Sequence, residues 1–279
     1  MASKPTANTS DPVVQIHPQF ARPTSAELLA PLVAQVGRHS RLSIASAGSF
    51  VDQGSRHIHI PRVTLRGPET AQAPTRLGIF AAIHGDEPAT ATGLVHWLAE
   101  RARHPELTAG YEIVAYPLVN PTGYEDGTRH NRRGHDLNRR FWTSSTLPEI
   151  VILENELRVQ RFDGIIALHA DDTSDGLYGY AHGRVLNESL LEPALLAAET
   201  HLPRNHRRVI DGFQARAGMI RDCFPGVLSA PPAQRPQPFD LIFETPAAAP
   251  EALQIRAIGA ALDSILAEYR QFIAYGLNL

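Results

Sequence analysis

Four short apolar runs, separated by segments of helical length, constrain the fold of this chain more than any other feature. The runs are residues 76–83, 111–119, 164–168 and 239–243. They are continuous rather than alternating, which is typical of strands covered on both faces. Amphipathic segments suited to helices follow at 89–103, 147–162 and 250–273. This alternation predicts a three-layer α/β/α fold, in which helices cover both faces of a mixed, mainly parallel, twisted sheet.

The remaining segments give weaker signals. Residues 24–37 begin with Thr24 and Ser25 as candidate caps and continue with apolar residues at helical spacing. We also expect a strand at 56–65, a helix at 188–202, and irregular structure at 124–147 and 203–238. Residues 1–22 are polar and rich in Pro, Thr and Ser. We therefore expect a flexible N-terminal arm at 1–22 and a single domain at 23–279.

The composition argues against several classes of protein. The net charge is −3, from 26 basic and 29 acidic residues, so nothing indicates binding to nucleic acid or to a membrane surface. Cys223 is the sole cysteine, which excludes a disulfide framework within the chain and fits a reducing compartment. No apolar run reaches the roughly 20 residues that span a bilayer, and the N-terminus does not resemble a signal peptide. We expect a cytoplasmic protein.

Three of the apolar runs end at residues with metal or acid–base chemistry. His84 follows 76–83, His169 follows 164–168, and Glu244 follows 239–243. Ligands of open α/β sheets bind beyond the carboxyl ends of the strands, so these side chains are expected to meet in one cleft. Glu87 lies three residues after His84 and is near enough to join them.

This set of side chains suits one zinc ion. Catalytic zinc usually has three protein ligands and an open fourth position. His84, Glu87 and His169 would supply the ligands, and Glu244 is then the candidate base that takes a proton from water.

Simpler interpretations of these residues remain open at this point. A histidine at the end of a strand is more often a satisfied polar residue, and a lone glutamate there is usually a turn residue. His84 is the one histidine of 13 with Glu three residues later. His169 is followed at the same spacing by Asp172, so the inverted assignment has to be considered.

The basic segment 127–142 is the other informative stretch, with arginines at 129, 132, 133, 139 and 140. It could be a solvated loop or a nucleic-acid patch. Against both, it also carries Asn131, Asp136 and Asn138 and ends in Phe141 and Trp142, which suggests that it is anchored in the fold. Arginines directed into a zinc cleft would bind a carboxylate or stabilise an oxyanion.

Together these motifs resemble the zinc metallocarboxypeptidases of the carboxypeptidase A type. The resemblance is strongest to the compact branch that contains the murein-peptide amidases and the succinylglutamate desuccinylase/aspartoacylase group. The motifs that carry it are HGDE (84–87), NPTG (120–123), TRHN (128–131), GHDLNRRF (134–141), LHA (168–170) and FETP (243–246).

The resemblance implies a role for each matching residue. His84, Glu87 and His169 correspond to the zinc ligands. Glu244 corresponds to the base that activates the water and later protonates the leaving amine. Asp136 corresponds to the carboxylate that orients a ligand histidine, which fixes the ring tautomer.

The basic segment matches the residues that hold the substrate in the family. Arg129 corresponds to the arginine that polarises the scissile carbonyl, and Asn138 with Arg139 to the pair that grips a terminal carboxylate. The resemblance thus implies hydrolysis of a peptide or peptide-like amide next to a free carboxylate. The alternatives are an N-acyl-amino-acid deacylase and a catalytically silent carboxylate-binding module, which the intact Glu244 argues against. The expected partner is a small peptide or an N-acyl amino acid.

The chain departs from the family pattern around the substrate. Digestive members close a tyrosine over the substrate, but no tyrosine occurs between Tyr180 and Tyr269, so Phe213 or Phe224 would have to act instead. The charged residues expected near the substrate side chain suggest opposite substrate preferences. Asp171 and Asp172 could repel acidic groups or bind an amine, whereas Arg216 and Arg221 could receive an acidic side chain if they line the pocket. Cys223 is a weak candidate nucleophile because no histidine is paired with it in sequence.

Overall fold

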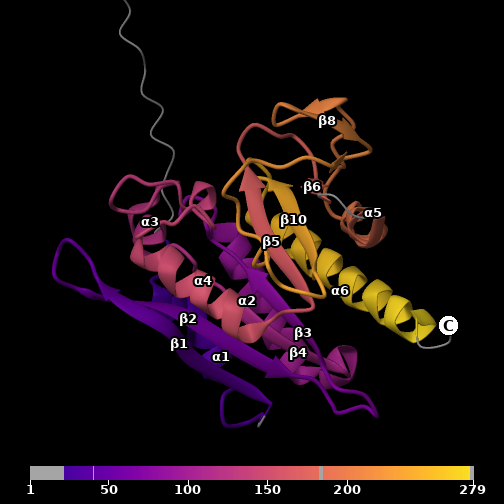
Figure 1. Ribbon diagram of the computed structural model, residues 1–279, viewed down its shortest axis with the longest axis horizontal. Coiled ribbons are helices and arrows are strands. Elements are labelled where there is room, and N and C mark those ends of the chain that lie inside the picture. The colour runs from indigo at the N-terminus through magenta and orange to yellow at the C-terminus, as the bar shows by residue number, and fades with distance from the viewer. Residues whose placement is uncertain (1–21, 40, 182–184, 277–279) are drawn as a thin grey trace, which may run out of the picture.

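A mixed sheet runs through the middle of the computed structural model, which describes residues 22–39, 41–181 and 185–276 (Figure 1). Its central strands run parallel and side by side: β4 (Tyr111–Tyr116), β3 (Thr75–Phe80), β5 (Gly164–Asp171) and β10 (Phe239–Pro246). The antiparallel strands β1 (Leu42–Val51) and β2 (His57–Arg66) extend the sheet beyond β4. Beyond β10 the order is β6 (Tyr178–Tyr180), β9 (Met219–Ile220), β8 (Phe213–Arg216) and β7 (Val209–Ile210). The predicted mixed, mainly parallel sheet is confirmed.

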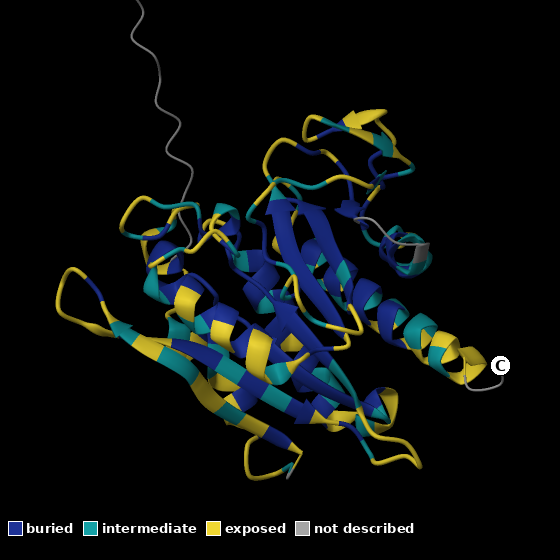
Figure 2. Cartoon of the chain, viewed as in Figure 1, coloured by how far each residue is buried: buried dark blue, intermediate teal, exposed yellow. Residues whose placement is uncertain are grey.

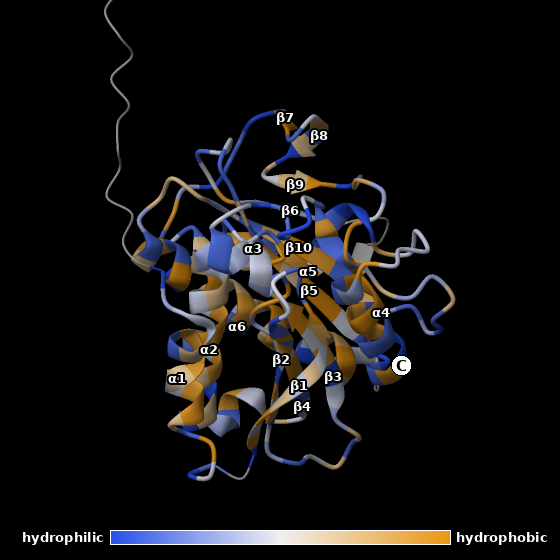
Figure 3. Ribbon diagram, turned by 90° about the vertical axis from the view of Figure 1, so that its left-hand side faces the viewer, coloured by the Kyte–Doolittle hydropathy of each residue, from blue (hydrophilic) through white to orange (hydrophobic). Residues whose placement is uncertain are grey.

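Helices cover both faces of this sheet. The helices α1 (Ser25–Val33), α2 (Pro88–Arg103), α5 (Val185–Ala198) and α6 (Glu251–Gly276) pack together against one face. The opposite face is covered by α4 (Pro148–Gln160) and by the segments around residues 137–142 and 224–230. Figure 3 shows α1, α2 and α6 on one side of the sheet and α4 on the other. The α/β/α layers predicted from the sequence are therefore present.

Local sequence signals explain where these helices begin. The Thr24 hydroxyl accepts a hydrogen bond from Glu27 N, and the Glu27 carboxylate accepts one from Thr24 N, so α1 starts with a capping box. Pro88 and Pro148 occupy the first turns of α2 and α4, where a missing N–H costs nothing. The short helix α3 (Pro121–Asp126) likewise starts at a proline and is capped by the Asn120 side chain.

Several elements differ from the sequence-based expectations. Strand β1 was not predicted, because its sequence LSIASAGSFV has neither a continuous apolar run nor a strict alternation, and Leu42 is its one buried residue. The segment 203–238 contains the short strands β7, β8 and β9 rather than irregular structure throughout. The strand predicted at 111–119 ends at Tyr116, immediately before Pro117. The arm predicted at residues 1–22 lies, except for Arg22, outside the described residues.

The central strands are almost entirely buried. Figure 2 shows β5 and β10 as buried along most of their length, whereas β1 and β8 carry exposed residues. The described part of the chain contains no helix that combines the length and the apolar character needed to cross a bilayer.

One buried acid in this sheet predicts a pH-dependent stability. Asp240 on β10 is partly exposed as a residue, but its carboxyl group is buried. This burial raises the pKa of the carboxyl to about 7. A hydrogen bond from Ala230 N to Oδ2, at 3.1 Å, acts in the opposite direction but is the smaller effect. Because the folded state holds this proton more tightly than the unfolded state, stability should fall as the pH rises from about 4 to about 7. Replacing Asp240 with asparagine should raise the free energy of unfolding at pH 8 by about 2–4 kcal/mol and leave it nearly unchanged at pH 4.

Urea unfolding at several pH values measures this effect as the difference between variant and wild type, in which other titrating groups cancel. Asp222→Asn, at an exposed position, removes the same charge and serves as the control. A constant difference across this pH range for Asp240→Asn would show that Asp240 titrates normally.

Candidate active site

The loop that follows β3 presents His84 and Glu87 to the carboxyl edge of the sheet. Ala82 has φ +48°, a left-handed conformation that is rare for alanine, and its N–H donates to the Thr90 hydroxyl at 3.0 Å. Thr90 in turn donates to the carbonyl of Glu87, so the first turn of α2 fixes the loop. Glu87 occupies the cap position of α2, but its side chain makes no capping bond. Its carboxylate is thus free to turn toward the histidines.

Backbone packing between motifs requires a glycine in this loop. A Cβ on Gly85 would lie 2.0 Å from the carbonyl carbon of Gly123, so HGDE and NPTG pack backbone to backbone. The Arg22 guanidinium donates to the Gly85 carbonyl at 2.6 Å. The loop that carries His84 is therefore held from both sides.

Neighbouring strands place His169 and Glu244 next to each other. His169 on β5 is paired in register with Glu244 on β10, so both side chains point to the same face of the sheet. Both residues are buried. The parallel register accounts for the convergence that the strand ends predicted.

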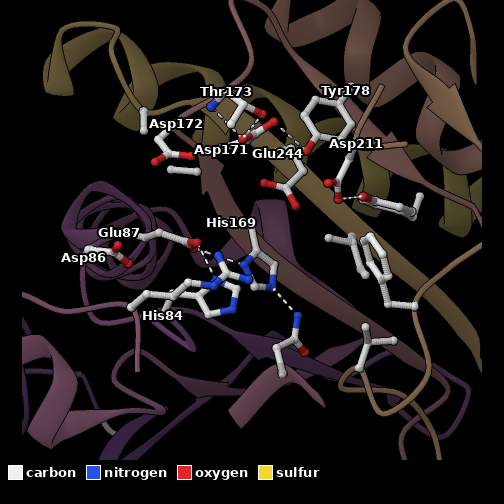
Figure 4. Close-up of a pocket in the computed structure, with 18 of the residues that line it drawn as sticks. His84, Asp86, Glu87, His169, Asp171, Asp172, Thr173, Tyr178, Asp211 and Glu244 are labelled. Carbon is white, nitrogen blue, oxygen red and sulfur yellow. Dashed lines mark hydrogen bonds and ion pairs between the residues drawn. The ribbon is translucent and has the colours of Figure 1, made fainter. Parts of the chain in front are cut away.

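The three predicted ligands come together around the Glu87 carboxylate. His84 Nδ1 lies 2.5 Å from Glu87 Oε1, and His169 Nδ1 lies 3.0 Å from Glu87 Oε2 (Figure 4). One ligand atom from each residue lies within 4.8 Å of the others, and all three residues are buried. A buried group of two imidazoles and one carboxylate has the donor chemistry of a catalytic zinc site. Asp172, the alternative partner of His169, is exposed and does not belong to this group.

The burial and the charges of the site shift the pKa values of these three side chains. Burial favours the neutral form of His84, but the charges of Glu87 and Asp136 outweigh it and raise the pKa of His84. Burial would raise the pKa of Glu87, yet the two histidines lower it. Burial lowers the pKa of His169 more than Glu87 raises it. Glu87 is therefore a carboxylate in the metal-free site, and a cation that binds here would displace the proton of His84.

Asp136 contacts both a predicted ligand and a predicted catalytic residue. Its Oδ1 lies 3.3 Å from His84 Nε2, the ring nitrogen that faces away from Glu87. Its Oδ2 accepts from Arg129 Nε and Nη2 at 3.2 and 3.1 Å. Burial alone would raise the pKa of Asp136. The hydrogen bond to His84 and the nearby positive charges outweigh burial and lower it. The geometry matches a carboxylate that orients a ligand histidine.

Asn138 and Arg139 lie in a short 3₁₀ helix, Leu137–Arg139, at the edge of the same cavity. Asn138 Oδ1 accepts from Leu228 N at 2.8 Å, and its Nδ2 lies 3.3 Å from His169 Nε2. The Arg139 guanidinium lies 4.2 Å from the centroid of the Phe224 ring. All eight site residues predicted from the sequence thus lie around one centre.

Comparison with known proteins agrees with this geometry. A family model of the succinylglutamate desuccinylase/aspartoacylase catalytic domain matches residues 73–188. A candidate metallopeptidase from Shewanella denitrificans OS217 is 25% identical, with a TM-score of 0.70 over 86% of this chain and 88% of that chain. One from Shewanella amazonensis SB2B is also 25% identical, with a TM-score of 0.68 over 85% and 89%. No curated protein matches the chain by sequence.

The chain is zinc carboxypeptidase-like and lies near the succinylglutamate desuccinylase/aspartoacylase group. The resemblance predicted from the sequence is confirmed. A metallo-carboxypeptidase from Pseudomonas aeruginosa, solved in complex with (2-guanidinoethylmercapto)succinic acid, shares the fold at 18% identity, with a TM-score of 0.63 over 85% of this chain and 67% of that chain. These neighbours support a metal-dependent hydrolase, and the His84, Glu87 and His169 group can hold its metal.

The cavity of this carboxypeptidase-like chain has a volume of about 270 Å³ and includes residues that the sequence did not single out. Tyr178 lies opposite Glu244 in the β6–β10 pair, and Tyr180 lies opposite Ile242. Asp211 enters from the turn between β7 and β8. The alternation Tyr178–Gly179–Tyr180 was the available signal, but a three-residue strand is too short to be recognised by its pattern.

The structure also shows which of the residues considered as substrate contacts line the cavity. Neither Arg216 nor Arg221 lines the cavity, and Arg221 pairs with Glu188 at 2.7 Å. Cys223 and Phe224 do line it, while Phe213 packs behind Phe224 with ring centroids 4.7 Å apart. Burial raises the pKa of Cys223, which disfavours a nucleophilic thiolate.

Proposed function

We propose that this protein is a zinc-dependent hydrolase that cleaves a peptide or peptide-like amide bond adjacent to a free carboxylate. One observation carries the proposal. His84, Glu87 and His169 converge to within 4.8 Å, beside the buried carboxylate of Glu244, in a cavity also lined by Arg129, Asn138 and Arg139. A zinc ion held by the three ligands would polarise the substrate carbonyl and lower the pKa of a water molecule.

The side chains of the chain would perform the remaining steps. Glu244 takes one proton as the water oxygen attacks the carbonyl carbon. The Arg129 guanidinium stabilises the negative charge that develops on the carbonyl oxygen. Glu244 then gives its proton to the amide nitrogen as the C–N bond breaks, and the proton that remains on the new carboxylic acid passes to the freed amine, so that a carboxylate and an ammonium group leave. Asn138 and Arg139 hold the free carboxylate of the substrate and set which bond lies over the base.

A deacylase acting on N-acyl amino acids is the second candidate. The match of residues 73–188 to the succinylglutamate desuccinylase/aspartoacylase domain favours it. The bond broken and the residues that break it would be the same, because an N-acyl amino acid also carries an amide next to a free carboxylate. The two candidates differ in what lies on the acyl side of that bond.

Metal removal combined with a substrate panel tests the proposal. Chelated protein should lose activity, and one equivalent of zinc per chain should restore it. The panel contrasts short peptides with N-acetyl and N-succinyl amino acids, and pairs each substrate with its carboxyl-terminal amide. Amidation should lower kcat/KM by about 10–100-fold, since the charge-assisted bonds to Asn138 and Arg139 are lost. Full activity after chelation, or equal rates for acids and amides, would contradict the proposal.

A further inference from the structure

Two acids without partners line the side of the cavity next to Glu87. Asp86 belongs to the loop after β3, and Asp172 directly follows β5. Both side chains line the cavity, and Figure 4 shows them on the side of His84 and Glu87, opposite Asp211. Within the described part of the chain, neither carboxylate makes a hydrogen bond or an ion pair with another residue. Both acids are therefore free for a ligand.

Asp171, the third aspartate on this side, is used within the protein. Its Oδ1 accepts from the backbone N–H and the hydroxyl of Thr173, each at 2.8 Å. Its Oδ2 accepts from the Tyr178 hydroxyl at 3.0 Å. These bonds hold the turn at residues 171–173, so Asp172 is the acid that this turn offers to the cavity.

The two free acids and the predicted carboxylate clamp lie on opposite sides of His169. The Nδ1 atom of His169 lies 3.0 Å from the carboxylate of Glu87, the residue after Asp86. Its Nε2 atom, on the other side of the ring, lies 3.3 Å from Asn138 Nδ2. A substrate whose carboxylate is held at Asn138 and Arg139 has its scissile amide at this centre. Its acyl part therefore continues toward the two acids.

A second, independent observation indicates that a ligand enters this space. Glu244 is 8% exposed and lies beside His169 in the sheet. Figure 4 shows its carboxylate pointing into the cavity, where it makes no hydrogen bond with the residues that the structure describes. A buried polar side chain without a partner normally has water or a ligand beside it. The space that Glu244 shares with Asp86 and Asp172 is therefore one that the substrate occupies.

The charges on this side of the cavity favour a cation. Among the described residues that line the cavity, the basic side chains other than the two histidines are Arg129 and Arg139. Arg129 is paired with Asp136, and Arg139 belongs to the predicted carboxylate clamp. Neither is left to balance Asp86 and Asp172. An anionic acyl group would meet these acids as like charges, whereas an ammonium group would meet opposite charges.

We propose that Asp86 and Asp172 determine specificity on the acyl side of the scissile bond by binding the ammonium group of a peptide with a free amino terminus. This inference rests on the proposed function and deepens it. The substrate class is short peptides of two or three residues. N-acetyl and N-succinyl amino acids are then poor substrates, because the first offers these acids no charge and the second offers a like charge.

A charge series on the acyl group tests this subsite. The amino acid that leaves is kept constant, and its nitrogen carries an alanyl, a lactoyl or a succinyl group. Lactoyl has the size of alanyl but a hydroxyl in place of the ammonium, which is mostly protonated at pH 6.5. At this pH, kcat/KM should fall about 3–10-fold at each step from alanyl to lactoyl to succinyl. A second series with one more alanine before the scissile bond shows at which length the ammonium is bound.

Substitution of each acid assigns the preference to it. Asp86→Asn and Asp172→Asn should each lower the alanyl value and raise the succinyl value, and the double variant should abolish the preference for alanyl over lactoyl. Asp222→Asn, an equal charge change at an exposed position outside the cavity lining, should preserve the preference. Because Asp86 adjoins Glu87, the zinc content of every variant is measured. Asp172→Asn tests the subsite from outside the loop that carries these ligands.

Binding separates a failure of this inference from a failure of the proposed function. Zinc-loaded Glu244→Gln, which should not cleave the ligands, is titrated calorimetrically with the alanyl and lactoyl compounds. Tighter binding of alanyl that depends on Asp86 and Asp172, without cleavage of any compound by the wild type, would support the subsite and overturn the hydrolase. Cleavage without a preference for alanyl at either length, or an equal loss for all acyl groups in the two variants, would overturn the subsite.

Discussion

Replacing Glu244 with glutamine is expected to lower kcat about a thousandfold or more, while the protein still binds one zinc ion and the substrate. Glutamine keeps the size of the side chain and its place beside His169 but cannot accept the proton of water. The proposed ligands are unchanged, since Glu244 makes no contact that fixes His84, Glu87 or His169. KM should therefore change much less than kcat. Steady-state kinetics and metal analysis on the same preparation measure both quantities.

The same substitution should increase the stability of the metal-free protein. Burial raises the pKa of Glu244 well above its usual range, and the negative charges of Glu87, Asp171 and Asp211 raise it further. A neutral amide at this position removes the cost of burying the acid among these like charges. Loss of activity with a gain in stability is the pattern expected of a residue kept for catalysis.

Glu69→Gln in the loop between β2 and β3 provides the control, because it makes the same change at an exposed position outside the cavity lining. It should alter neither kcat nor stability measurably. If Glu244→Gln retains activity within a factor of ten of the wild type, Glu244 is not the base. The proposed order of proton transfers would then have to be abandoned.

The centre of the site was predictable because it depends on the positions of strand ends. Continuous apolar runs identified β3, β5 and β10, and parallel pairing brings their carboxyl ends to one edge of the sheet. His169 and Glu244 each directly follow an apolar run, so parallel strands that end at the same edge should place them side by side. β5 and β10 do pair these two residues in register. Physical reasoning about the strands therefore located His84, His169 and Glu244 without any knowledge of a relative.

The roles of the basic segment needed the family resemblance. Nothing in the spacing of Arg129, Asp136 and Asn138 shows that all three face the cleft. Their convergence depends on the loop between α3 and α4, where Asp136 accepts from both Asn138 N and the Arg129 guanidinium. Such side-chain contacts over a few residues in a loop have no periodicity that could reveal them.

The far wall of the cavity was not predictable by either route. Tyr180 and Asp211 meet because β6 pairs with β10 while the β7–β8 hairpin folds over it. These strands have between two and four residues, too few for an alternating pattern to emerge. This wall of the cavity therefore lies in the part of the chain where local sequence has the least influence on structure.

The second large effect concerns the metal. Replacing His169 with alanine should weaken zinc binding about a thousandfold and abolish turnover at limiting zinc. The reason is that each of three ligands contributes roughly a third of a binding free energy of about 10–16 kcal/mol. Asp136→Asn should have a smaller effect, about 10–100-fold, because it alters the orientation and basicity of His84 rather than removing a ligand. His96→Ala, an exposed histidine on α2, should have none.

Competition with a chromophoric chelator ranks these three variants on one scale, independently of activity. The ranking matters more than any single value, because unfolding could also release the metal. Circular dichroism and thermal unfolding of the metal-free variants must therefore match the metal-free wild type before affinities are compared. If His169→Ala binds zinc as tightly as His96→Ala, the convergence of His84, Glu87 and His169 is a structural hydrogen-bond cluster, and the metal site lies elsewhere.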